Sequence, residues 1–180
     1  MEFDIAFMLG LLSSLATLVS LQLKDMRLVL VCQIVCNGAG ALNYILTEGF
    51  SGSGIYIIAI LQSLVFFVLR AKNKETPNFM AVTFVVCYLI CSALTYKVPL
   101  DIIPAVATLT CAFGVAQKNP SKYRLLILAN GTIWILYDLI QPASITMAIS
   151  HVITIASALI GIIRLDILSK KLNASLEGNI

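Results

Sequence analysis

The segment that decides the fold is L-A-N-G-T-I-W-I-L-Y-D-L, residues Leu128–Leu139. Asn-Gly between apolar residues is usually the strongest local signal for a tight hairpin turn. Here the apolar sequence continues on both sides of Asn130-Gly131, which favours an uninterrupted helix. A second copy of the pattern, V-C-N-G-A-G-A-L-N-Y, occupies Val35–Tyr44, and in both copies a Tyr follows the Asn by seven residues. The two segments predict a pair of related apolar helices, each with a polar notch at its centre.

The composition predicts a membrane protein. Of the 180 residues, 59% are hydrophobic and 12% are charged, and the mean hydropathy is +0.97. An ordinary soluble domain is about one-quarter charged, and a chain of this size still exposes about a third of its unfolded surface. So much apolar surface needs lipid as its solvent. Long unbroken apolar runs in place of alternating strand patterns predict an all-α polytopic membrane protein.

Seven segments approach the roughly 20 apolar residues that a helix needs to cross a bilayer. Short connections separate them. We expect transmembrane helices near Ile5–Leu23, Met26–Leu46, Ser51–Leu69, Phe79–Tyr96, Leu100–Ala116, Tyr123–Ile140 and Ala143–Leu165, followed by a polar tail.

The distribution of charge orients these helices. If the amino terminus lies outside, eleven of the twelve basic residues fall in the inside loops and the tail, and only Lys97 is left outside. Basic residues concentrate on the cytoplasmic side of membrane proteins. The count of seven and an N-out, C-in orientation therefore support each other.

The order of the motifs predicts an internal repeat. Asn37 and Asn130 anchor it, and each is followed 33 or 34 residues later by an Arg that ends the next helix, Arg70 or Arg164. Helices one to three thus match helices five to seven, and the fourth is a linker that restores the orientation. The result is a 3+1+3 protein with parallel repeats. The expected units are a first triple-helix bundle at 1–70, the linker at 71–97, a second bundle at 98–166 and a cytoplasmic tail at 167–180.

The chain resembles the YgjV-type family of bacterial inner-membrane proteins, which is distantly similar to the SWEET and PQ-loop transporters. The resemblance is carried by L-Q-L-K-D-M-R at Leu21–Arg27, the segment from Asn37 to Tyr44, and G-F-S-G-S-G at Gly49–Gly54 leading to L-V-F at Leu64–Phe66. It implies a multi-pass protein of the bacterial inner membrane. SWEET transporters have parallel repeats of the predicted kind, so the resemblance also implies a SWEET-like arrangement and indicates architecture more than activity.

The candidate site centres on the two asparagines. At 1.5 Å per residue, Asn37 and Asn130 both lie near the middle of the bilayer, where an amide facing lipid is costly. Two interpretations are open. In the structural one, each amide bonds a neighbouring helix and locks its own triplet. In the functional one, both line a central cavity and bind a polar solute.

Other polar residues extend the candidate site. Trp134 follows the second asparagine by four residues, so the two share a helix face, and its ring suits stacking on a solute as well as core packing. His151 is the only histidine, and either carries protons or is a hydrogen-bonded structural residue. Gln62, Asn43 and Ser157 are further polar side chains in apolar helices, and we include them among the solute-binding candidates.

The sequence lacks the motifs that are typical of several classes of enzyme and cofactor site. The sequence has no hydrolase elbow, zinc signature, P-loop or dinucleotide fingerprint, so we expect neither an enzyme nor a bound cofactor or metal. Its five cysteines lie within apolar runs, as buried small residues do. The net charge of +3 reflects cytoplasmic loops rather than nucleic-acid affinity.

The leading hypothesis is a transporter that moves a small, neutral polar solute by alternating access at a midplane site between the two bundles. The alternative is a non-transporting membrane scaffold or regulator whose buried polar residues are structural. The expected partners are the solute and the lipid bilayer, and homo-oligomerisation is left open.

Overall fold

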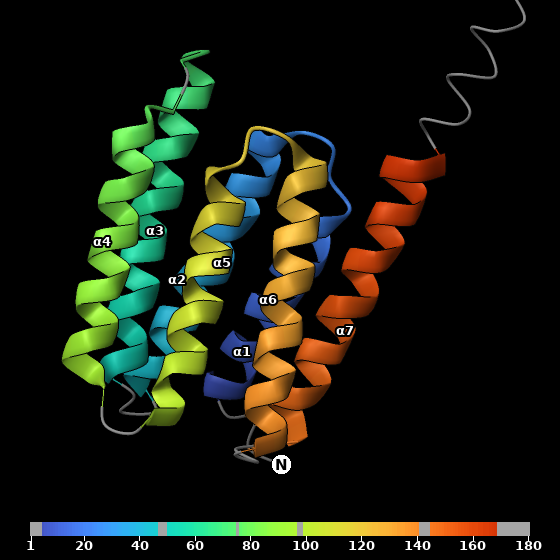
Figure 1. Ribbon diagram of the computed structural model, residues 1–180. Helices are drawn as coiled ribbons and strands as arrows, with labels where there is room; N and C mark the ends of the chain where they lie inside the picture. The colour runs from blue at the N-terminus through green and yellow to red at the C-terminus, as the bar shows by residue number, and fades with distance from the viewer. Residues whose placement is uncertain (1–4, 47–49, 75, 97–98, 141–144, 169–180) are drawn as a thin grey trace, which may run out of the picture.

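The computed structural model of the chain describes residues 5–46, 50–74, 76–96, 99–140 and 145–168, without the side chains of residues 6, 44, 50–53, 104, 138–139 and 145–150. Tyr44 and Asp138 are therefore outside the described side chains. Within the described ranges the chain is all-helical (Figure 1). The elements are α1 (Ile5–Leu21), α2 (Met26–Leu46), α3 (Phe50–Ala71), α4 (Asn78–Thr95), the 3-10 turn η1 (Pro99–Asp101), α5 (Ile102–Ala116), α6 (Pro120–Ile140), α7 (Ile145–Gly161) and the π-helix η2 (Ile162–Leu168).

The seven α-helices coincide with the seven predicted segments, and their bounds agree within four residues. Five stretches are long and apolar enough to cross a membrane: those in α2, α3 and α4, the stretch of η1 with α5, and the stretch of α7 with η2. The apolar part of α1, Phe7–Leu21, is shorter. Helix α6 has the length but carries Lys122, Arg124 and Asn130, which lower its hydropathy. A membrane crossing by α1 and α6 stays a prediction.

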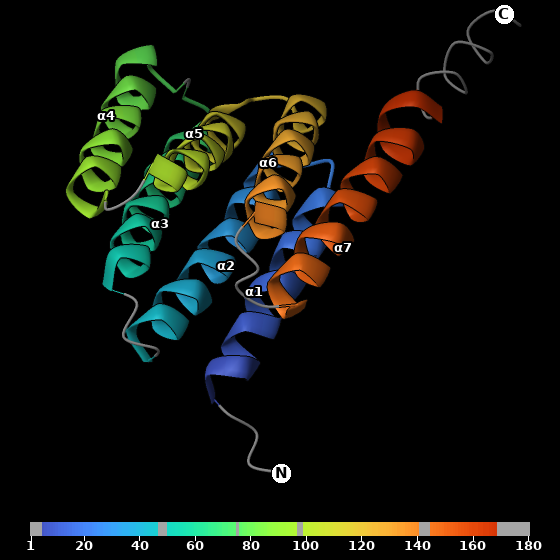
Figure 2. The ribbon, with the colours of Figure 1, turned by 60° about the horizontal axis from the view of Figure 1, so that its bottom comes forward.

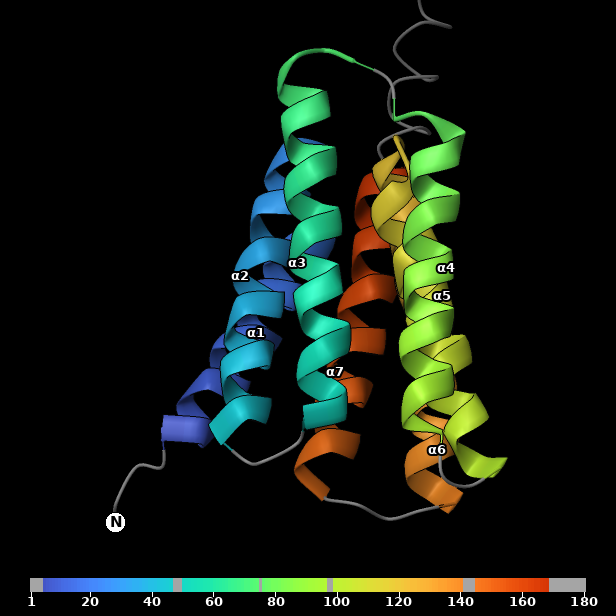
Figure 3. The same ribbon diagram turned by 90° about the vertical axis from the view of Figure 1, so that its left-hand side faces the viewer.

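The helices form two facing rows. In the first row α2 packs between α1 and α3, and in the second α6 packs between α5 and α7. The rows meet where α1 contacts α7 and where α3 contacts α5, and α4 lies outside, against α3 and α5. Figure 2 shows the rows running side by side, with α2 opposite α6, and Figure 3 shows α4 on the outer side of α5. The two helices that carry the Asn-Gly pairs therefore occupy equivalent central positions.

The central helices α2 and α6 begin in the same way. The Asp25 carboxylate accepts a hydrogen bond from the backbone N–H of Arg27 at 2.8 Å, and the Asn119 side chain accepts one from Ser121 at 2.8 Å. Both are N-caps, which satisfy donors that the first helical turn leaves without a partner. Each helix is 21 residues long.

One end of the bundle carries most of the charge. Helices α1, α3 and α5 end there and α2, α4 and α6 begin there, at the top of Figure 1. We call it the basic end because the described residues there include Lys24, Arg70, Lys118 and Arg124. The buried apolar cluster lies nearest this end and takes side chains from both rows, among them Leu30 of α2 and Ile127 of α6. The two rows are thus packed together at the basic end.

The outer surface of the helices is apolar. Large aliphatic and aromatic side chains are exposed on every α-helix of the bundle, including Leu94 of α4 and Leu125 of α6. Exposed apolar surface on this scale would favour association in water, whereas in a bilayer it is solvated by lipid chains. This finding agrees with the membrane assignment from composition.

Candidate functional site

A buried hydrogen-bond network joins the two rows in the half of the bundle nearest the basic end. The Gln33 amide on α2 donates to the Tyr123 hydroxyl on α6 at 2.8 Å, and that hydroxyl pairs with the Ser20 hydroxyl of α1, also at 2.8 Å. All three side chains are buried. The sequence analysis did not select them, although Gln33 lies four residues before Asn37 on an apolar helix, a spacing that puts both on one face.

Asn37 lies one helical turn from Gln33 toward the opposite end. Its side chain is only 7% exposed, and within the described part of the chain the amide has no hydrogen-bond partner. Gln33 points from α2 toward α6, and Asn37, four residues later, lies on the same face of α2 and so also points toward the second row. The neighbouring Gly38 borders open space, since a Cβ atom placed there would meet nothing within 4 Å. Gly38 lies on the same face of α2 as the exposed Val35 and Leu42, so this open space is on the outer side of the helix, and Asn37 is a buried amide on the opposite side.

Asn130 has a different environment. Its Nδ2 donates to the Ala107 carbonyl oxygen of α5 at 2.6 Å and is 3.4 Å from the Thr110 hydroxyl. Both partners belong to the second row, so this amide joins neighbouring helices of one triplet. The structural interpretation suits Asn130 and the cavity interpretation suits Asn37, even though the two asparagines have the same sequence spacing.

Trp134 and His151 lie together between α6 and α7. Their rings are stacked, with centroids 5.5 Å apart and planes 9° from parallel. The Tyr137 ring meets the indole edge-on at 5.7 Å. Asn130 is one turn away on the same face of α6. The structure thus brings two of the predicted site residues, Trp134 and His151, into contact, whereas Asn130 bonds α5.

Three other candidates lie elsewhere. Gln62 is 2% exposed and links three helices, because Tyr88 of α4 donates to its Oε1 at 3.0 Å and its Nε2 donates to the Ala112 carbonyl of α5 at 3.0 Å. Ser157 of α7 accepts from the Gln22 amide at 3.0 Å through its hydroxyl.

Asn43 lies against α1, where its Nδ2 is 3.5 Å from the position of a Cβ on Gly10. The seven predicted residues therefore do not form one cluster, and their role in solute binding stays a prediction.

Two arginines bind helix ends across the rows. Arg124 of α6 is 1% exposed, and its guanidinium donates to the Leu21 and Leu23 carbonyls at the end of α1. It also forms a 2.6 Å salt bridge with Asp166. Arg70, at the end of α3, donates to the last carbonyls of α5, including that of Gln117. Carbonyls at helix C-termini lack partners within the helix and attract cations.

The count of basic residues groups Arg124 with the inside loops, whereas the expected helix Tyr123–Ile140 contains it, and the structure places it within α6. The expected last helix ends at Leu165, and η2 continues to Leu168. The buried salt bridge left no local signal, since its partners are 42 residues apart.

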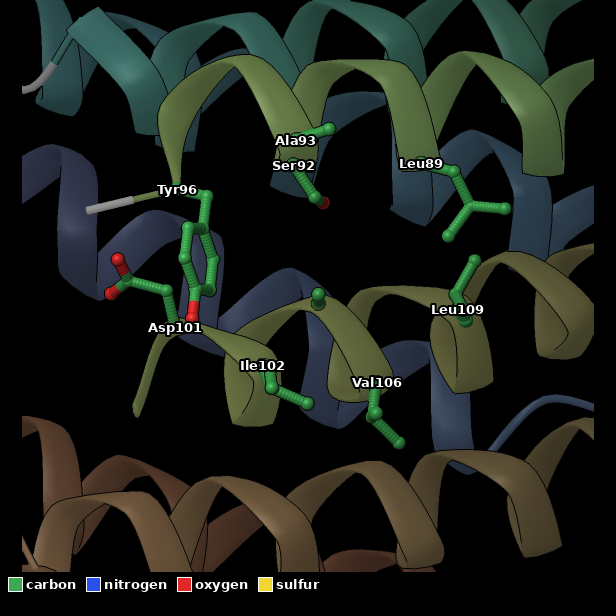
Figure 4. Close-up of a pocket in the computed structure, with 9 residues that line it drawn as sticks. Leu89, Ser92, Ala93, Tyr96, Asp101, Ile102, Val106 and Leu109 are labelled. Atoms are coloured by element: carbon green, nitrogen blue, oxygen red, sulfur yellow. The ribbon is translucent and has the colours of Figure 1, made fainter. Parts of the chain in front are cut away.

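Two cavities stand out in the described structure. One of about 440 Å³ lies between α4 and α5 and is lined mostly by aliphatic side chains, with Tyr96 and Asp101 near one end (Figure 4). The other, of about 550 Å³, is polar and lies at the basic end. Neither is lined by a predicted solute-binding residue. Among the residues that the structure describes, no group of three His, Cys, Asp or Glu side chains is placed to hold a metal ion.

The comparisons with known proteins point to one family. No curated protein and no solved structure matches the chain. A family model described as bacterial inner membrane protein, Imp-YgjV, matches residues 4–168. That match covers all seven α-helices and agrees with a bundle whose apolar faces point outward. The chain is a multi-pass protein of the bacterial inner membrane and belongs to the Imp-YgjV family.

Proposed function

We propose that the protein is a transporter for a small, neutral polar solute, which binds between the two rows near Asn37. The observation that carries this proposal is the Asn37 amide, which is buried, lies on the same face of α2 as Gln33 and has no hydrogen-bond partner in the described chain. A buried polar group without a partner is costly. In the empty protein water would form hydrogen bonds with the Asn37 amide, and in the loaded protein a hydroxyl or amide of the solute would replace that water.

The closed basic end supports alternating access. Between Asn37 and the basic end, the rows are joined by the Ser20–Gln33–Tyr123 network and by the apolar cluster that takes side chains from both rows. A solute would then enter from the opposite end and be released at the basic end, after the rows rock apart and this network breaks. Rocking of two repeats around a fixed site is the usual mode of such transporters.

The arrangement of the rows supports the proposed repeat. A twofold axis between α2 and α6, along the helix direction, would exchange α1 with α5 and α3 with α7, as parallel repeats require. The proposal is supported by the pairing of α1 with α7 and of α3 with α5, and by the Asx cap at the start of both central helices. The expected units, 1–70, 71–97, 98–166 and 167–180, stay part of this proposal.

Substitution of each of the two asparagines tests the proposed function. Asn37→Ala should leave the unfolding temperature nearly unchanged and abolish ligand stabilisation. Asn130→Ala should lower stability by about 0.6–1.7 kcal/mol, the range for hydrogen bonds between membrane helices. It should retain part of the ligand response. The measurement is thermal unfolding in detergent against a panel of monosaccharides, disaccharides, polyols and neutral amino acids, because a bound ligand stabilises the folded state.

Any compound that stabilises the wild type should then enter proteoliposomes that contain the protein and not those that contain Asn37→Ala. A wild type that responds to no member of the panel, together with an Asn37→Ala variant that unfolds far more readily, would refute the transporter proposal.

A second candidate is a scaffold or regulator that transports nothing. It is favoured by the bonds that Asn130, Gln62 and Ser157 make to neighbouring helices. In that case the buried amides contribute only to the helix packing. The panel measurement separates the two candidates, since a scaffold has no reason to bind a small solute at Asn37.

The orientation is tested by cysteine labelling in a variant whose native cysteines are replaced by serine or alanine. Lys72→Cys at the basic end should react with a membrane-impermeant maleimide only after the cells are opened, and Tyr96→Cys at the opposite end should react in intact spheroplasts. Both positions are exposed. The reason is the eleven-to-one division of basic residues. The reverse pattern of labelling would show that the amino terminus is cytoplasmic.

A further inference from the structure

A polar cavity of about 550 Å³ lies at the basic end, away from Asn37. Its lining comes from the turn between α1 and α2, the end of α3, the connection before α4, and the turn between α5 and α6. The residues are Lys24, Asp25, Met26, Arg27, Arg70, Asn73, Lys74, Thr76, Lys118 and Pro120. Both rows thus contribute to one pocket.

The lining is strongly cationic. The described residues include five cations, Lys24, Arg27, Arg70, Lys74 and Lys118, and one carboxylate, Asp25. That carboxylate already caps α2 by accepting from the Arg27 backbone N–H. A concave surface with one sign of charge concentrates ions of the opposite sign. The pocket therefore favours an anion.

Two donors in the pocket have no acceptor. Arg70 is held by its Nη2, which donates to the final carbonyls of α5, whereas its buried Nη1 has no partner. The Thr76 hydroxyl oxygen is also buried and without a partner. Buried donors are nearly always satisfied, so this pair indicates an acceptor that the described part of the chain does not provide. The guanidinium is fixed by the α5 carbonyls before any ligand arrives, which lowers the entropic cost of binding.

We propose that this pocket binds a phosphate group. A phosphate carries several acceptor oxygens and a negative charge, and Arg and Lys are the side chains that usually bind it. The positive-inside rule alone would place lysines at this end. It does not account for an immobilised Arg70 and a Thr76 hydroxyl that both lack acceptors in one cavity. The same chemistry is offered by free phosphate and by the headgroup of an anionic phospholipid.

A bound phosphate would tie the two rows together. Arg27 reaches over the end of α3 to donate to the Asn73 side chain at 2.6 Å, so the first row and the connection before α4 already form one unit. Pro120 belongs to the start of α6 in the second row. An anion between these elements adds a link at the end where the rows are closed. This inference does not depend on the identity of a transported solute.

The test uses the full-length protein in a neutral detergent, with unfolding followed by the fluorescence of Trp134, the only tryptophan. Sodium phosphate is titrated against sodium chloride at matched ionic strength. In a second arm the protein is placed in phosphatidylcholine nanodiscs with or without phosphatidylglycerol. The pocket variants are Lys24→Gln with Lys74→Gln, and Thr76→Val alone. The matched control is Lys72→Gln with Lys122→Gln, which removes the same charge from exposed residues outside the pocket.

We expect a saturable rise in the unfolding temperature of the wild type. The pocket double variant should weaken the apparent affinity at least about tenfold, which corresponds to about 1.4 kcal/mol. Thr76→Val should weaken it severalfold, and the control double variant should behave like the wild type. A response to phosphate alone identifies free phosphate, and a response to phosphatidylglycerol alone identifies a lipid headgroup.

The absence of a saturable response in both arms would overturn the proposal. Equal weakening in the pocket and control variants would also overturn it, because diffuse surface charge would then be the cause. Asn37→Ala serves as a separate check, since it should keep the phosphate response whether or not the solute proposal holds.

Discussion

Arg124→Gln should lower the free energy of unfolding by about 3–5 kcal/mol, which is the usual cost of removing one partner of a buried ion pair. The guanidinium bonds the Leu21 and Leu23 carbonyls of α1 and the Asp166 carboxylate of η2. A glutamine side chain is too short to reach all three, and the loss leaves the partly buried Asp166 carboxylate without its cation. Chemical or thermal unfolding in detergent micelles, read from Trp134 fluorescence, measures the change.

Lys122→Gln is the matched control, because it removes a cation two residues away on the same helix from an exposed side chain. Its effect should stay within about 0.5 kcal/mol. A double-mutant cycle with Asp166→Asn should give a coupling energy of about 1–3 kcal/mol, as expected for residues in one network. If Arg124→Gln were no more destabilising than Lys122→Gln, the cross-row network would contribute nothing to stability.

Gly161→Ala should destabilise the protein by about 1–3 kcal/mol, the typical cost of overpacking. A Cβ atom there would lie 2.6 Å from the Leu21 carbonyl oxygen and 3.0 Å from Arg124 Cδ. The first of these is a backbone atom, so α1 and α7 must move apart to make room. The shift would also disturb the Arg124 bond to the same carbonyl. Melting temperature and the yield of folded protein both report the change.

Gly38→Ala is the same substitution in a different environment. A Cβ atom at Gly38 would meet nothing within 4 Å, and alanine favours a helix over glycine by up to about 1 kcal/mol. The variant should therefore be as stable as the wild type or more stable. If Gly161→Ala were as stable as Gly38→Ala, the close contact between α1 and α7 would be absent in the folded protein.

The helices themselves followed from the sequence. Length and hydropathy of the apolar runs are local properties, and they placed all seven α-helices within four residues of their observed bounds. Spacing along a helix also placed Trp134 on the same face as Asn130. The family assignment from Leu21–Arg27 and the segment after Asn37 agrees with the match over residues 4–168.

Other features depend on which helix lies opposite each residue. Asn37 and Asn130 have the same sequence context, yet one has no partner in the described chain and the other bonds the Ala107 carbonyl. Arg124 resembles an exposed loop cation in the sequence, but it is buried against α1 and η2. The acceptors of these side chains are up to 103 residues away along the chain.

Composition and the lengths of the apolar runs by themselves determined that the protein is a membrane bundle, and they placed its helices within four residues of the observed bounds. Those properties depend on contacts within a few residues and on the preference of apolar side chains for lipid. The tertiary structure alone decided which polar groups find partners. A hydrogen bond between helices requires two side chains at the same depth on facing surfaces. Helical periodicity sets the face but not the neighbour, and so only the packed rows distinguish a paired amide from an open one.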